Sequence, residues 1–104
     1  MNLFNQQQRQ NIDRNVASVI DFLNYKFRKT QVHLTESPCY FYRGNKSKLE
    51  VIVFSNPQIG KIDVRMIGLK NYDREPSFEC SYDLDGLSMT AFQRHIDDLI
   101  SKIN

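Results

Sequence analysis

The stretch L-E-V-I-V-F-S-N-P-Q-I-G-K-I-D-V-R-M-I, residues 49–67, predicts a β-hairpin in the middle of the chain. Apolar residues alternate with others on both sides of a turn, which gives each strand one clearly apolar face. Pro57 favours the second position of a type I turn, and Gly60 can adopt the positive φ needed at the exit. A loop over residues 56–59 fixes the register. The predicted cross-strand pairs are Val53 with Ile62, Val51 with Val64, Leu49 with Met66, and Glu50 with Arg65.

A long helix is predicted before the hairpin, over residues 6–29. Asn5 is the expected N-cap, and Gln8 occupies the capping-box position three residues later. Three cations fall in the predicted last turn, where they would oppose the helix dipole. The apolar residues recur at the spacing of one helical stripe. This stripe consists of Ile12, Val16, Val19, Ile20, Leu23 and Phe27.

Residues 31–43 are rich in β-forming residues, but Pro38 interrupts them. The segment is therefore either two short strands or one edge strand with a break, and it is left open whether residues 31–38 form a strand. Residues 44–47 form the turn into the hairpin. The alternation that we expect puts Cys39 and Phe41 on the apolar face and the two neighbouring tyrosines on the opposite face.

The last strand is predicted over residues 77–84, with Phe78, Cys80 and Tyr82 facing inward. A second helix follows over residues 89–103, capped by Ser88 or by Thr90. Pairing the last strand with the hairpin brings opposite charges together on the outer face, which supports this register. The predicted pairs are Met66 with Phe78, Arg65 with Glu79, and Lys61 with Asp83.

The predicted fold is a single α+β domain over residues 1–104. It has an N-terminal helix, an antiparallel four- to five-stranded β-meander and a C-terminal helix. Because each helix has an apolar stripe to bury, we expect both helices to pack on one face of the sheet. The residues expected to share the core are Val19, Val51, Val64, Phe78 and Phe92.

The composition is that of an ordinary globular domain, with 104 residues, 40% of them hydrophobic and 25% charged. No apolar run approaches the roughly 20 residues that span a bilayer, and the N-terminus does not resemble a signal peptide. We therefore expect a cytoplasmic protein with no membrane partner. Its two cysteines, Cys39 and Cys80, are expected to be reduced, as is usual in that compartment.

Catalytic chemistry has few candidates in this sequence. The histidines are His33 and His95 only, and neither they nor the inward-facing cysteines lie in a nucleophile motif or at a zinc spacing. No glycine-rich phosphate-binding loop is present. The expectation is a protein that is not an enzyme and has neither a metal nor a cofactor.

Binding has better candidates, and we expect a small interaction protein with a protein partner: an adaptor, a chaperone, or a phage- or mobile-element-type inhibitor of a host nucleic-acid-handling enzyme. Aromatic residues and arginine favour interfaces, so the face opposite the helices is one candidate surface, for a partner or for a homodimer. A second is acidic, since residues 73–98 contain seven carboxylates and two arginines. Such carboxylates suit a cationic groove. The candidates are Tyr40, Tyr42, Ile52, Phe54 and Arg65 on the first surface, and Asp83, Asp85, Asp97 and Asp98 on the second.

The alternative function is that of a nucleic-acid-binding accessory domain. The element order is similar to that of double-stranded RNA-binding domains, and aromatic residues among cations suit stacking on single strands. Residues 26–48 contain six cations and one carboxylate. The second helix departs from the RNA-binding pattern, because it lacks a lysine cluster at its start. The candidate contacts are Lys26, Arg28, Lys29, Arg43, Lys46 and Lys48.

Overall fold

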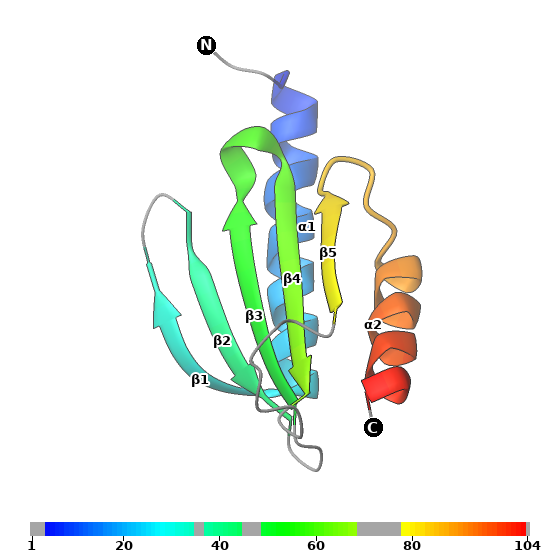
Figure 1. Ribbon diagram of the computed structural model, residues 1–104. Coiled ribbons are helices and arrows are strands. Elements are labelled where there is room, and N and C mark those ends of the chain that lie inside the picture. Colours follow the sequence, from blue (N-terminus) through cyan, green and yellow to red (C-terminus); the bar gives the residue numbers. More distant parts are fainter. Residues whose placement is uncertain (1–3, 35–36, 45–48, 69–77, 104) are drawn as a thin grey trace.

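A computed structural model of the protein describes residues 4–34, 37–44, 49–68 and 78–103. Two helices flank five strands along the chain, and a short 3-10 turn, η1, connects the third and fourth strands (Figure 1). The elements are α1 (Gln6–Lys26), β1 (Arg28–His33), β2 (Cys39–Arg43), β3 (Leu49–Asn56), η1 (Pro57–Ile59), β4 (Lys61–Gly68), β5 (Phe78–Asp83) and α2 (Met89–Ile103).

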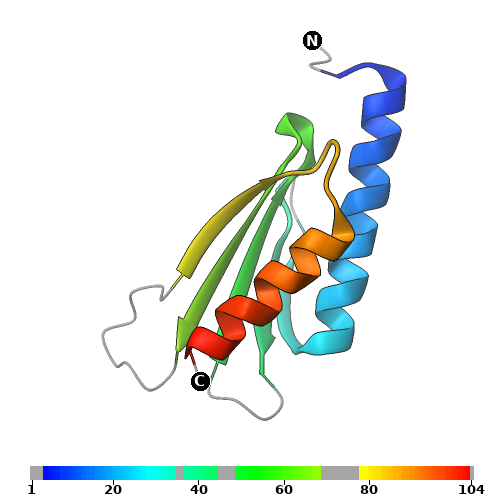
Figure 2. The same cartoon turned by 90° about the vertical axis from the view of Figure 1, so that its right-hand side faces the viewer.

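The five strands form one antiparallel sheet in the order β1-β2-β3-β4-β5. Both helices lie on the same side of this sheet, α1 behind its middle and α2 behind and beside β5 (Figures 1 and 2). We call the helix-covered side the inner face and the opposite side the outer face. The predicted α+β fold, with both helices on one face, is confirmed, and the sheet has five strands because residues 28–33 form β1.

The core lies between the inner face and the two helices. Alternate residues of β3 and β4 are buried, as expected for strands with one covered face. Val19, Val51, Val64 and Phe92 are buried there, and Phe78 packs against them, as predicted. Phe92 joins the layers, because its ring makes edge contacts with Phe22 of α1 and Tyr82 of β5. These contacts fix α2 against both the sheet and α1.

The register of the central hairpin differs from the prediction by two residues. β3 extends to Asn56, which pairs with Lys61, so that Val53 faces Val64 and not Ile62. The cause is the turn itself: η1 and Gly60, which has a φ of 67°, fill the connection and leave residue 56 in the strand. An even shift keeps every side chain on its predicted face. It also replaces the predicted Glu50–Arg65 pair by Ile52 with Arg65 and Glu50 with Ile67.

The first helix ends three residues earlier than predicted. Its N-terminus has the predicted capping box between Asn5 and Gln8, but it ends at Lys26, and Phe27 is already extended. Arg28 and Lys29 therefore belong to β1, where they pair with Arg43 and Tyr42 of β2. At the second helix the predicted Ser88 cap is confirmed, since its Oγ accepts a hydrogen bond from Ala91 N–H.

The faces of β2 are the reverse of those predicted. Tyr42 pairs with Val51 and Tyr40 pairs with Val53, which puts both tyrosines on the inner face. Cys39 and Phe41 consequently lie on the outer face. The prediction was wrong because C-Y-F-Y-R has aromatic residues in both alternating positions, so its apolar pattern does not choose a face. The observed register, in which Phe41 pairs with Ile52, differs by one residue from the registers that would turn Phe41 inward.

Truncating Val64 tests the inner core directly. Its side chain is 1% exposed at the centre of β4, so Val64→Ala removes two buried methyl groups and leaves a cavity. We expect the free energy of unfolding to fall by about 1–3 kcal/mol. Urea denaturation of the two proteins measures this change. An unchanged midpoint would contradict the core described here.

Candidate functional site

Three apolar side chains lie together in the middle of the outer face. Phe41 of β2 is paired with Ile52 of β3, and Phe54 follows two residues along β3 on the same face. All three are only partly buried, and no element that the structure describes covers them (Figures 1 and 2). We define the outer-face patch as these three residues together with Arg65 of β4, which pairs with Ile52.

Arg65 is held in place over the patch by two contacts. Its guanidinium carbon lies 4.9 Å from the centroid of the Phe54 ring, a cation–π geometry. Its Nε donates a hydrogen bond of 2.9 Å to Glu79 Oε1 of β5. The aromatic ring and the cation therefore form one prearranged unit. Aromatic and arginine side chains of this kind are the residues that most often dominate binding energy at protein interfaces.

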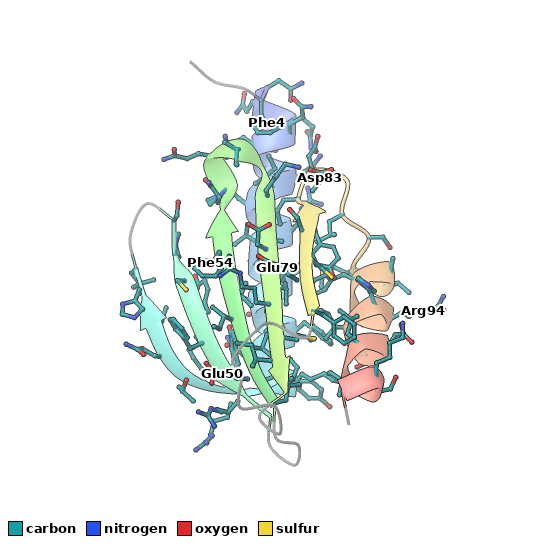
Figure 3. The ribbon with its side chains drawn as sticks, viewed as in Figure 1. Phe4, Glu50, Phe54, Glu79, Asp83 and Arg94 are labelled. Carbon is teal, nitrogen blue, oxygen red and sulfur yellow. The ribbon has the colours of Figure 1, made fainter. Side chains whose placement is uncertain are left out.

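Ion pairs surround the apolar centre. Arg65–Glu79 and Lys61–Asp83 join β4 to β5 at 2.9 Å and 2.6 Å, as predicted, and Arg43–Glu50 joins β2 to β3 at 3.4 Å. Figure 3 shows the acidic members of these pairs around Phe54 on the sheet. Among the described residues the outer face has equal numbers of positive and negative charges. These are Arg28, Arg43, Lys61 and Arg65 against Glu50, Asp63, Glu79 and Asp83.

Tyr42 and Tyr40, both predicted to belong to this surface, lie on the other side of the sheet. Tyr42 is 0% exposed, and its hydroxyl donates a 3.2 Å hydrogen bond to Asn24 Oδ1 of α1. Burial raises the pKa of Tyr42 to about 12. Tyr40 is half-buried, with Lys29 Nζ 5.5 Å from its ring centroid. The inward placement makes Tyr42 a core residue and corrects the predicted outer-face position of both tyrosines.

The raised pKa of Tyr42 predicts a loss of stability at alkaline pH. The unfolded chain releases this proton near pH 10, whereas the folded chain holds it up to about pH 12. Between these values the folded state binds more protons, so the free energy of unfolding falls as pH rises, by at most about 1.4 kcal/mol per pH unit. Burial also raises the pKa of Tyr82, which adds to the loss.

Urea denaturation at a series of pH values measures this loss, with Tyr42→Phe as the matched variant. The variant lacks the titrating hydroxyl of residue 42, so its decline above pH 10 should be shallower than that of the wild type. If the free energy of unfolding fell equally steeply with pH in both proteins, the Tyr42 hydroxyl would not have the raised pKa given above.

The acidic candidates do not form one surface. Each carboxylate already has a partner: Asp83 pairs with Lys61, and Asp98 pairs with Lys102. Asp85 accepts a hydrogen bond from Gln8 at the start of α1, whereas Asp97 pairs with Lys26 at the end of α1. Those two ends are eighteen residues apart, or about 27 Å along the helix. The carboxylates are therefore spread along the length of the domain.

The basic candidates are divided as well. Lys26 is paired with Asp97, and Arg43 with Glu50. Arg28 lies on the outer face opposite Arg43, whereas Lys29, opposite Tyr42, lies on the inner side of the same strand. Lys46 and Lys48 lie outside the described residues. Among the four basic candidates that the structure describes, only Arg28 and Arg43 are thus brought together on one face.

Sequence reasoning missed Phe41, and the signal that could have found it was electrostatic. Arg43 and Glu50 are cross-strand partners, and opposite charges favour such positions. Choosing the register that pairs them places Tyr42 against Val51 and turns Phe41 outward. Charge pairing predicted the β4–β5 register correctly by the same logic.

His33 and Cys39 are two potentially reactive residues that lie next to each other on the sheet. They are cross-strand partners on the outer face, where Cys39 was not expected. The His33 ring packs edge-on against Phe41, at 5.6 Å between centroids. Burial raises the pKa of the Cys39 thiol, which opposes formation of the nucleophilic thiolate despite the counteracting charge of Arg65. Both cysteines are free thiols, and Cys80 faces inward as predicted.

Within the described ranges, no three histidine, cysteine, aspartate or glutamate side chains gather closely enough to hold a metal ion. Neither of the two described helices combines the length and apolar content needed to cross a membrane. Comparison of the chain with protein-family models, with curated proteins and with solved structures found no match.

Proposed function

We propose that this chain is a small non-enzymatic interaction protein that binds another protein through the outer-face patch. One observation supports this proposal above the others: Phe41, Ile52 and Phe54 form an apolar centre that no described element covers. An apolar centre with a polar rim is the usual anatomy of a protein interface. Here the ion pairs provide the rim, and Arg65 is already oriented over Phe54.

The charge of the outer face favours a protein over a nucleic acid. A surface that neutralises phosphates needs an excess of free cations, since affinity for nucleic acid depends largely on them. The described outer face has no such excess, and Arg43, Lys61 and Arg65 each have a carboxylate partner. A nucleic-acid ligand is therefore the second candidate, supported only by the proximity of Arg28 and Arg43 to Phe41.

An affinity pull-down from the source cells, with and without nuclease, tests the proposal. We expect one protein to be recovered in stoichiometric amount in both cases, and to be lost with the double variant Phe41→Ala/Phe54→Ala. Tyr25→Ala is the matched control, because Tyr25 is 89% exposed on α1, away from the outer face. Recovery of nucleic acid alone, released at raised salt, would overturn the proposal in favour of the second candidate.

A further inference from the structure

β1 is an open edge of the sheet. It is first in the strand order, so β2 is its only neighbour among the described strands, and all six of its residues are exposed. Along an edge strand, alternate backbone N–H and C=O groups point away from the sheet without a strand partner. These groups are a template on which another extended chain can pair.

The side chains of this edge are distributed unevenly. Arg28 and Lys29 lie at its start, and neither forms an ion pair with a carboxylate among the described residues. Residues 22–35 contain no aspartate or glutamate at all. At the other end, Val32 is 39% exposed and Leu34 is 76% exposed. The edge therefore presents two cations, an open backbone and then two apolar side chains.

We propose that β1 binds an extended acidic segment of a partner protein, which adds to the sheet as a sixth, antiparallel strand. Its carboxylates would lie against Arg28 and Lys29, and its apolar residues against Val32 and Leu34. This inference rests on the proposed function, because both require a protein partner. The surface is different, since the segment binds the edge of the sheet and not the outer-face patch. It also specifies the chemistry of the partner.

The positive charge of β1 favours an acidic strand over other strands that could pair with it. Cations and bulges on an edge strand discourage indiscriminate pairing, and β1 has both, with an irregularity between Lys29 and Gln31. A second copy of β1 would add further cations to the seam and no carboxylate. An acidic strand instead compensates the cations while it forms the backbone hydrogen bonds. The antiparallel direction is the more stable pairing and continues the rest of the sheet.

A labelled six-residue peptide serves as the probe, with valine and threonine at its N-terminal end and two glutamates at its C-terminal end. In an antiparallel complex the glutamates meet Arg28 and Lys29. Fluorescence anisotropy should show saturable binding that weakens with salt. Replacing the glutamates by lysine, or N-methylating the peptide backbone, should weaken binding by about tenfold or more, because each change removes one of the two proposed interactions. Amide exchange in β1 should slow when the probe is added.

Two charge-matched variants localise the site. The double variant Arg28→Glu/Lys29→Glu should bind the probe about tenfold more weakly, or worse. The control variant Arg14→Glu/Arg94→Glu makes the same change in net charge at exposed helical positions. It should alter probe binding by less than about twofold. Figure 3 shows Arg94 pointing away from the domain on α2. Equal loss in both variants, an N-methylated peptide that binds as well as the probe, or no saturable binding would overturn the proposal. Sedimentation that shows self-association through β1 would overturn it too.

Phe41→Ala/Phe54→Ala separates this inference from the proposed function. The double variant should retain probe binding while it loses the partner recovered in the pull-down. If the partner depends on the patch and the probe does not bind, the edge proposal alone fails. If the probe binds and no partner depends on the patch, the proposed function fails.

Discussion

Replacing both Phe41 and Phe54 by alanine is expected to weaken binding of the protein partner by at least about 100-fold. The two rings are two of the three apolar side chains of the outer-face patch. Truncation of a residue at the centre of an interface often costs about 2 kcal/mol or more. A loss of about 1.4 kcal/mol corresponds to a tenfold change in affinity. Removing Phe54 also removes the ring beneath the Arg65 guanidinium. Isothermal titration with the captured partner measures the change.

The interpretation requires that the double variant remain folded. Both side chains lie on the uncovered face and are only partly buried, so their truncation leaves the inner core intact. Circular dichroism and a thermal melt check this. Tyr25→Ala also removes an aromatic side chain, one that is far more exposed and lies on α1. It should leave the affinity for the partner within about twofold of the wild type. Affinity retained by the double variant, or lost equally in Tyr25→Ala, would rule out the patch as the binding surface.

Tyr42→Ala is expected to have the largest effect on stability of the substitutions considered. The side chain is 0% exposed, its ring packs near Phe27 at 6.4 Å between centroids, and its hydroxyl bonds to Asn24. Removing a buried aromatic ring costs about 3–5 kcal/mol, from lost burial and the cavity that remains. A domain of this size is typically stable by about 5–15 kcal/mol, so the variant should be close to unfolding at moderate temperature.

Tyr42→Phe provides the matched comparison. It keeps the ring and removes only the hydrogen bond to Asn24, so we expect a loss of about 0.5–1.5 kcal/mol. Urea denaturation of the three proteins gives both values. If Tyr42→Ala were as stable as the wild type, the ring would not be in the core, and the register of β2 described here would be wrong.

Regular alternation and charge pairing made much of the fold predictable. β3 and β4 alternate strictly, so their faces were assigned correctly even though the turn shifted their register by two residues. The β4–β5 pairs were predicted in full, because Arg65 meets Glu79 and Lys61 meets Asp83 only in one register. Each helix has a single apolar stripe, and neither stripe could be buried except against the sheet.

The sequence was least informative where local preference and tertiary pairing compete. Residues 27–29 continue a helical pattern, but Phe27 is extended, and Arg28 and Lys29 pair with β2 at the start of β1. In β2, tyrosine and phenylalanine suit both faces equally, and Phe41 was therefore assigned to the wrong one. The acidic residues are close in the sequence but not in space, since Asp85 and Asp97 contact opposite ends of α1.

The central claim is that a protein partner docks on the outer face, and δ1-methyl NMR of the isoleucines tests it most directly. Ile52 and Ile67 lie on the outer face, whereas Ile62 and Ile96 are buried in the inner core. On addition of the captured partner, we expect the methyl signals of Ile52 and Ile67 to shift or broaden, and those of Ile62 and Ile96 to remain in place. Unchanged signals from Ile52 and Ile67, with shifts confined to Ile20 of α1 and Ile100 of α2, would contradict the claim.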